Sequence, residues 1–326
     1  MRLLRYVFIA SVFFGYGYLQ STELTYTFSG GRFGDNLIAY VHAKWVAYKY
    51  GLKLLYKPFA YSDQLVLHKE EAYFDKNKHY DNIIKLTDKI KINTAIAANW
   101  LYIVPYYPEC IAELNQFKRA YPFCCAVDWN DPVFLANVRY LISPIKQLQL
   151  LSLPTDRRCV ALHVRKGGGY DAKPLLDGGV FRTTKGATAA DVSYPLKFPP
   201  DDFYIEQLKN VSTFFNNAPL YVYIFTDDQD PKRLADKYSS ELKLPNITFD
   251  YRKTGNAHNT NVLEDFFSMM KFDVLIRSES SFSLVASRLA PEQLVIYPLT
   301  ASYQSNEQWS HGLLKITQFC VVKNKG

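Results

Sequence analysis

The stretch Cys159-Val-Ala-Leu-His163-Val-Arg165-Lys166-Gly167-Gly168-Gly169-Tyr170-Asp171 shows how this chain is organised. Its first five residues are mostly apolar and lack Pro and Gly, which predicts a short buried β-strand. The strand leads directly into two cations and three glycines. Glycines let backbone N–H groups approach an anion closely, and the Arg fork fits phosphate oxygens. The stretch therefore predicts either an anion pocket for a phosphate or diphosphate, or a strand followed by a solvated, charged loop.

Strands and helices alternate from the start of the chain. Residues 24–29 alternate apolar and polar side chains, as a strand does, and apolar residues at helical spacing begin at Leu37. Gly51 stands where many helices end on glycine, and residues 53–56 predict the next strand. This βαβ opening is typical of nucleotide-binding folds. The intervening loop, Gly30–Asn36, does not match GxGxxG, which disfavours a dinucleotide oxidoreductase.

The same alternation continues beyond a domain junction that we expect near residues 150–157. Strands are predicted over 220–225, 246–249, 273–276 and 294–296, and helices over 132–151, 202–217, 231–238, 262–271 and about 281–289. This pattern predicts an α/β fold with a doubly wound parallel sheet. Residues 166–202 form a long segment rich in Gly, Thr and Pro, which we expect to be a functional or mobile loop that helps to shape an acceptor site.

A serine cluster follows the strand predicted over 273–276. Four serines lie between Ser278 and Ser283, directly before an apolar stretch with helical spacing. They offer hydroxyl groups, and the start of the helix offers unpaired N–H groups and the positive end of the helix dipole. This combination suits a phosphate. The alternative is that Ser280 or Ser281 is an ordinary N-cap.

Composition limits the classes of partner. The chain has 326 residues, enough for one large or two medium domains, and a net charge of +7. Its basic residues are scattered, which favours anionic small molecules over nucleic acid, and no nucleic-acid-binding motif is present. Its five cysteines form no CxxC pair, which disfavours a metal site built from cysteines.

The N-terminus predicts export or membrane attachment. Met1–Arg5 is basic, and Tyr6–Leu19 is uncharged and mainly apolar. These features are typical of a signal peptide or of an uncleaved anchor, which we expect over residues 1–21. Either would place the protein in the secretory pathway or at the cell envelope. The alternative is the first element of a cytoplasmic domain.

Three motifs in this chain resemble those of the fucosyltransferase superfamily, which holds the α-1,2-, α-1,6- and protein O-fucosyltransferases. Gly31-Arg-Phe-Gly34 resembles the family loop G-R-[FL]-G-N-Q, and His163-Val-Arg165-Lys166-Gly167 resembles H-x-R-R-x-D. Asp265 and the stretch from Asp273 to Ser283 resemble the C-terminal motif, an Asp ahead of a strand and a Ser/Thr-rich helix start. The α-1,2 members look closest.

The resemblance implies a GT-B-like fold, in which two Rossmann-like domains face a cleft. The acceptor-side domain would cover residues 22–153 and the nucleotide-sugar-binding domain residues 154–326. The implied reaction is an inverting transfer of fucose from GDP-fucose to a hydroxyl of a glycan or glycoconjugate. No cofactor and no metal is expected, since Asp227-Asp228 resembles the acidic pair at a strand end of the family rather than a metal site.

The resemblance also implies roles for individual residues. Arg165 would contact the β-phosphate and stabilise the leaving diphosphate, His163 would lie beside the nucleotide, and Asp265 would hold the guanine. The other donor-binding residues that it implies are Lys166 next to Arg165, Ser280 and Ser281 at the phosphate, and Arg32 and Asn36 facing the sugar.

The chain departs from the family motifs at four positions. Lys166 replaces the usual second Arg and so loses the bidentate fork. Gly168 replaces the usual Asp, so that carboxylate is either missing or supplied by Asp171 after a glycine insertion. Asp35 and Asn36 stand where the family has Asn and Gln. Asp35 is therefore a candidate base for the acceptor hydroxyl, with capping of the following helix as the alternative. Two rival functions stay open: a non-catalytic sugar-nucleotide or glycan-binding protein on the same fold, and a transferase that uses another nucleotide sugar.

Overall fold

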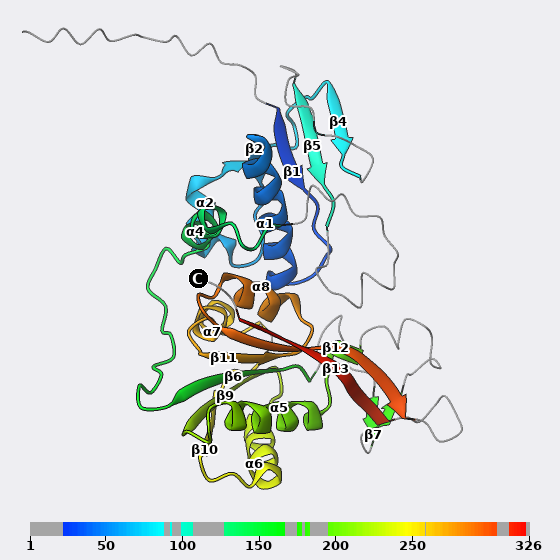
Figure 1. Cartoon of the computed structure of the whole chain (residues 1–326). Coiled ribbons are helices and arrows are strands. Elements are labelled where there is room, and N and C mark those ends of the chain that lie inside the picture. Colours follow the sequence, from blue (N-terminus) through cyan, green and yellow to red (C-terminus); the bar gives the residue numbers. More distant parts are fainter. Residues whose placement is uncertain are drawn as a thin grey trace, which may run out of the picture.

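The structure is a computed structural model that describes residues 22–87, 92, 99–106, 127–166, 175–177, 180–182, 195–257, 259–304 and 313–323. These residues form two α/β units, one above the other in Figure 1, the first built on a parallel sheet and the second on a mixed sheet. The predicted fold class, two Rossmann-like α/β units that face a cleft, is confirmed. The predicted leader or anchor over residues 1–21 lies outside the described residues. In the described part of the chain, no helix is both long and apolar enough to cross a membrane.

The N-terminal unit is the upper one in Figure 1. Its elements are β1 (Glu23–Tyr26), α1 (Phe33–Tyr50), β2 (Lys53–Tyr56), η1 (Ser62–Gln64), α2 (Leu67–Glu70), β3 (Ala72–Tyr73), β4 (Asn82–Lys85), β5 (Trp100–Val104) and α4 (Pro132–Leu141). Among the described strands the order is β3-β2-β1-β5-β4, with every pairing parallel. The predicted βαβ opening is confirmed, and α1 ends on Gly51 with φ +63°.

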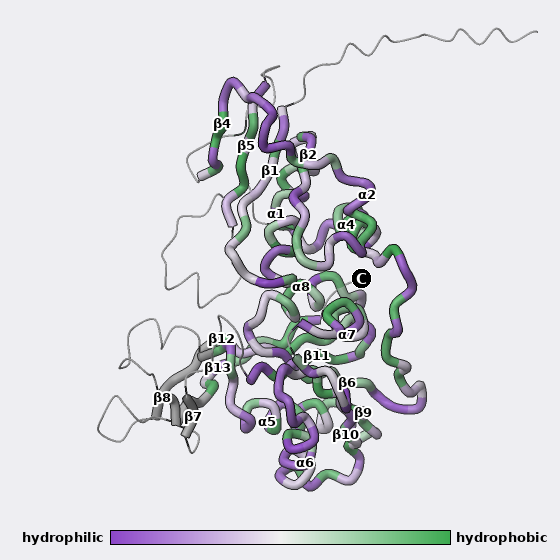
Figure 2. The backbone as a smooth tube through the Cα atoms, turned by 180° about the vertical axis from the view of Figure 1, so that it is seen from behind, coloured by the Kyte–Doolittle hydropathy of each residue, from purple (hydrophilic) through white to green (hydrophobic). Residues whose placement is uncertain are grey.

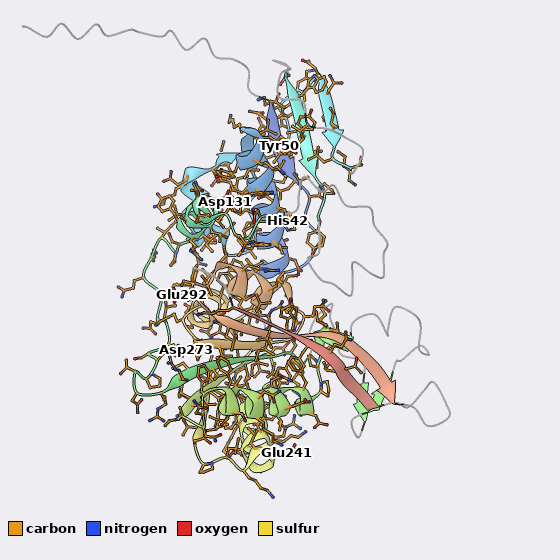
Figure 3. The ribbon with its side chains drawn as sticks, viewed as in Figure 1. His42, Tyr50, Asp131, Glu241, Asp273 and Glu292 are labelled. Atoms are coloured by element: carbon orange, nitrogen blue, oxygen red, sulfur yellow. The ribbon has the colours of Figure 1, made fainter. Side chains whose placement is uncertain are left out.

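Helix α4 is shorter than predicted. It begins where Asp131, labelled in Figure 3, accepts hydrogen bonds from the N–H groups of Val133 (3.0 Å) and Phe134 (2.9 Å), with Pro132 in the first turn. The prediction of a helix over 132–151 is wrong beyond Leu141. Pro144 disfavours a helical backbone at the residue before it, so the helix stops and an extended linker leads to the second unit.

The C-terminal unit is organised around the strand that the sequence singled out. Its elements are β6 (Arg158–Val164), β7 (Leu175–Asp177), β8 (Val180–Arg182), η4 (Pro195–Lys197), α5 (Asp201–Phe214), β9 (Leu220–Thr226), α6 (Pro231–Leu242), β10 (Ile247–Tyr251), α7 (Val262–Met269), β11 (Val274–Arg277), α8 (Ser281–Leu289), β12 (Leu294–Gln304) and β13 (Leu313–Lys323). The described strands lie in the order β10-β9-β6-β11-β12-β13-β8-β7. Because β6 is central and the later strands add on both of its sides, the chain order reverses between β6 and β11.

The prediction of a doubly wound parallel sheet is confirmed for the strands from β10 to β12 and is wrong for the strands beyond β12. Strands β13, β8 and β7 continue the sheet with antiparallel pairings, and β12 runs well past the predicted 294–296. Pro298 and the register shift beside it break the regular pattern from which a strand is predicted. Strands β7 and β8 also lie within the predicted loop 166–202, most of which is outside the described residues.

A shared apolar core joins the two units. Helix α1 buries residues on more than one of its faces, and these residues belong to one apolar cluster. That cluster also includes Val285 and Leu289 of α8, which are fully buried. A second cluster fills the other face of the C-terminal sheet, against α5 and α6. Figure 2 shows α6 as largely hydrophilic, consistent with a surface helix that buries one stripe. The contact between α1 and α8 therefore sets how the units face each other.

Candidate active site

A cavity of about 390 Å³ lies between the two units. The C-terminal unit lines it with residues from the carboxyl ends of β6 and β9 and from the start of α8. The N-terminal unit lines it with the loop that starts α1. Ligands of open parallel sheets bind outside the carboxyl ends of the strands, at the point where the strand order reverses. Strands β6 and β11 form that point here.

The structure brings eight of the nine predicted site residues together around this cavity. Four come from β6 and α8 or their ends, one from α7, and three from the loop and first turn of α1: His163, Arg165, Ser280, Ser281, Asp265, Arg32, Asp35 and Asn36. The ninth, Lys166, is not among the residues that line it. Gly168 and Asp171 lie outside the described residues.

Arg165 follows β6 and is held in place by neighbours of different kinds. Its Nε lies 3.5 Å from Oδ2 of Asp227, and its Nη1 donates a hydrogen bond to Oγ of Ser280 at 3.5 Å. The guanidinium carbon lies 5.8 Å from the ring centroid of Phe198. The side chain is only 10% exposed. A cation held this way presents a fixed positive charge to the cavity, with little reorganisation when an anion binds.

His163 is a neutral group in this site. Its Nδ1 lies 2.8 Å from Oγ of Ser283, and its ring packs against Phe282 with the centroids 5.8 Å apart. Burial, with the charges of Arg165 and Arg277, lowers the pKa of His163 to about 3. The imidazole is therefore uncharged at any ordinary pH and can act only as a hydrogen-bonding and packing group.

Lys166 turns away from the cavity. Its backbone N–H donates to Oδ1 of Asp227 at 2.6 Å, and its Nζ donates to Oδ1 of Asp201 at 2.7 Å. Asp201 also accepts hydrogen bonds from Lys237 (2.9 Å) and Tyr238 (2.8 Å). Burial alone would raise the pKa of Asp201, but these hydrogen-bond and charge partners outweigh burial and lower the pKa to about 2. Lys166 therefore anchors the end of β6 to the start of α5.

The starts of α1 and α8 meet at the cavity. Gly34 packs so closely on α8 that a Cβ atom added there would lie 2.4 Å from the backbone N of Phe282. Asp35 accepts a hydrogen bond on Oδ1 from the Ser281 hydroxyl at 2.7 Å, and one on Oδ2 from the Arg32 N–H at 3.2 Å. The expected capping of α1 by Asp35 is thus present. Two helix N-termini, each with its positive dipole end, face the same space.

Asn36 completes the part of the site that α1 contributes. Its Nδ2 donates to the carbonyl of Gly31 at 3.2 Å, and its backbone N–H donates to the Arg32 carbonyl at 3.0 Å, the first hydrogen bond of the helix. Arg32 and Asn36 are therefore fixed by the same turn that Asp35 caps. Both side chains are partly exposed, and both residues line the cavity.

Asp265 on α7 forms an ion pair with Arg252, which follows β10. Burial raises the pKa of Asp265 to about 6, although Arg252 opposes the shift. Residues of the loop between Gly255 and Asn261 line the cavity beside it, and Tyr61 of the other unit donates a hydrogen bond to the Asn259 carbonyl at 2.8 Å. A carboxylate and several amide groups thus surround this part of the cavity, which suits a nitrogen heterocycle with N–H donors.

Several lining residues were not predicted from the sequence, and Lys197 and Tyr61 are two of them. Lys197 lies in η4, a short turn without a periodic signal, and reaches the cavity because the Leu196 carbonyl accepts a hydrogen bond from the Glu279 N–H at 2.9 Å. Tyr61 has a φ of +68°, a left-handed conformation that its sequence does not indicate. In the residues that the structure covers, no group of three or more His, Cys, Asp or Glu side chains could hold a metal ion.

No protein-family model matches the chain, and no curated protein matches its sequence. Solved structures similar to it include a point mutant of FUT1 from Arabidopsis thaliana in complex with GDP, at 11% identity over 90% of this chain and 74% of that chain, with a TM-score of 0.49. NodZ α-1,6-fucosyltransferase soaked with GDP-fucose is similar at 11% identity, over 94% and 99% of the chains, with a TM-score of 0.43. POFUT1 in complex with GDP-fucose is similar at 12% identity, over 83% and 94%, with a TM-score of 0.42.

Proposed function

We propose that this chain is a glycosyltransferase that moves fucose from GDP-fucose to a hydroxyl of a glycan or glycoconjugate, with inversion and without a metal ion. The observation that supports this most is the convergence of Arg165 with the N-termini of α1 and α8 in one cavity between the units. All three are sources of positive potential. Such a site suits a ligand that carries a diphosphate.

The lining residues support one orientation of the donor in this cavity. Its phosphates would lie at Arg165 and at Ser280 and Ser281, and its guanine at Asp265, whose ionised carboxylate accepts hydrogen bonds from N–H groups. The sugar would then face Arg32 and Asn36 on the N-terminal unit. This arrangement keeps the bond between sugar and diphosphate near the junction of the two units.

In the reaction, the acceptor oxygen forms a bond to the anomeric carbon while the bond from that carbon to the β-phosphate oxygen breaks. The electron pair of the broken bond leaves with GDP, so negative charge grows on the phosphate. Fixed charges that face this phosphate therefore stabilise the transition state more than the ground state. Arg165 and the α8 N-terminus supply positive charge there, which is why we propose that no metal is needed.

The proton of the acceptor hydroxyl must go to a base. Asp35 is the candidate, because it lines the cavity from the N-terminal unit, whereas Arg165 lines it from the C-terminal unit. Attack from this side, with the diphosphate leaving toward the C-terminal unit, would invert the anomeric centre. Retention of wild-type turnover in Asp35→Asn would exclude this role.

Isothermal titration calorimetry with GDP, GDP-fucose and UDP tests the proposal. We expect GDP and GDP-fucose to bind, and Arg165→Ala to weaken GDP about 10- to 100-fold, because a charge-assisted contact is lost. Arg158→Ala is the matched control, since Arg158 lies at the opposite end of β6 and its side chain is 57% exposed.

The other outcomes discriminate between the rival functions. UDP binding without GDP binding would point to a transferase for another nucleotide sugar. GDP-fucose binding without release of GDP, across a panel of glycan acceptors, would point to a non-catalytic binding protein. Arg165→Ala should reduce turnover about 10²- to 10³-fold, as loss of comparable electrostatic donors does.

A further inference from the structure

The hydroxyl of Ser281 forms a hydrogen bond between the two units. It is the first residue of α8, and its Oγ donates to Oδ1 of Asp35 on α1 at 2.7 Å. A serine hydroxyl carries one proton, so it can donate to one acceptor at a time. In this structure the Ser281 hydroxyl donates its proton to the Asp35 carboxylate, and this hydrogen bond joins the N-termini of α1 and α8 at the cavity.

A phosphate in the cavity would compete for this proton. Ser281 lines the cavity with Arg165, and the first N–H groups of α8 have no partner within the helix, because its first internal hydrogen bond runs from Leu284 to Ser280. An anion drawn to these groups brings oxygens that only accept hydrogen bonds. It also brings negative charge close to the Asp35 carboxylate, which weakens the hold of Asp35 on the hydroxyl.

Asp35 would keep its position after losing Ser281. The Tyr106 hydroxyl donates to the same Oδ1 at 3.1 Å, and the Arg32 N–H donates to Oδ2 at 3.2 Å. Both partners belong to the N-terminal unit. The carboxylate is thus held by its own unit while Oδ1 regains the capacity to accept one more hydrogen bond at the cavity.

We propose that donor binding transfers the Ser281 hydroxyl from Asp35 to the phosphate and so opens Asp35 to the acceptor hydroxyl. This inference rests on the proposed function. The two substrates would then bind in order, donor before acceptor, because Oδ1 of Asp35 accepts two hydrogen bonds until a diphosphate takes the Ser281 hydroxyl. The exchange also makes nucleotide binding break a hydrogen bond between the units, at the point where they meet.

A double-mutant cycle on GDP affinity tests this exchange, using calorimetry on wild type, Ser281→Ala, Asp35→Asn and the double variant. In Asp35→Asn the competing charge is gone, so we expect GDP to bind about fivefold more tightly, the difference between a charged and a neutral hydrogen bond. Ser281→Ala should then weaken GDP binding more in the Asp35→Asn background than in wild type. Ser143→Ala is the matched control: it removes a serine hydroxyl that donates to the Tyr140 carbonyl at 2.7 Å, outside the cavity, and should leave GDP affinity unchanged.

The outcomes separate this inference from the proposed function. If wild type binds GDP, and Asp35→Asn and Ser281→Ala change its affinity independently or not at all, the hydroxyl stays on Asp35 and the exchange is refuted while the donor site stands. If wild type does not bind GDP, the proposed function falls and the exchange falls with it. Chemical denaturation of each variant shows that the compared proteins are folded.

Discussion

Replacing Gly34 by Ala should disturb the cavity without changing any of its polar groups. The added Cβ would lie 2.4 Å from the N and 2.6 Å from the Cα of Phe282, and 2.9 Å from the carbonyl carbon of Ser281. All three are backbone atoms at the start of α8, so no side chain can swing aside. Since ordinary contacts of a Cβ atom begin at about 3.4 Å, α1 and α8 must separate by about 1 Å.

The magnitude follows from this separation. Forcing one extra carbon into a packed contact costs about 1–3 kcal/mol of the free energy of unfolding. The effect on turnover should be larger, because Asp35 and Arg32 would move relative to Arg165 on the other side of the cavity. A misplacement of about 1 Å between reacting groups can cost about 10²-fold in rate.

The assay is GDP release from GDP-fucose, with unfolding by denaturant measured in parallel. Gly51→Ala is the matched control: Gly51 has φ +63° and no atom lies within 4 Å of an added Cβ. It should cost about 1 kcal/mol of stability through backbone strain and leave turnover unchanged. Wild-type turnover and stability in Gly34→Ala would refute the close contact between α1 and α8 and the argument built on it.

Two further predictions concern charged residues at and beside the site. Because burial raises the pKa of Asp265 to about 6, and its ionised form is the one that would hold guanine, GDP affinity should rise about tenfold from pH 5 to pH 7. Asp265→Asn should abolish this rise, and an identical pH dependence in calorimetry of both proteins would remove Asp265 from the donor site. Lys166→Met should lower the free energy of unfolding by about 1–3 kcal/mol and leave GDP affinity unchanged, since Lys166 contacts Asp201 outside the cavity. The pKa of Asp201 is depressed to about 2, so the stabilisation by its ion pair with Lys166 is present above pH 4 and is lost as the pH falls through 2. A large loss of GDP affinity in Lys166→Met would instead show that the Lys166 ammonium binds the donor.

Much of the site could be predicted because its signals are local. An apolar run that ends in Arg165, and a serine cluster before an apolar helix, are each set by residues that are neighbours in the chain. In parallel sheets the carboxyl ends of neighbouring strands share one edge, so local signals of this kind converge in space. His163, Arg165 and Ser281 accordingly line one cavity.

The parts that could not be predicted depend on contacts between distant residues. Lys166 has the same local sequence context as Arg165, and only the position of Asp201 at the start of α5 draws its ammonium away from the cavity. Lys197 reaches the cavity through a turn that has no periodic pattern. The antiparallel pairing of β13 with β12 also depends on a partner rather than on its own residues.

The sequence by itself determined the alternation of strands and helices around the cavity, the loops that carry positive charge, and the group of residues that could meet a diphosphate. Apolar periodicity, glycines and prolines act over a few residues, so they can be interpreted without a structure. Only the tertiary structure decided which of these groups bind one another. Ser281 and Asp35 are 246 residues apart, and Tyr61 and Asn259 are 198 apart. Such partners are chosen by the packing of α1 against α8, and no local pattern encodes that contact.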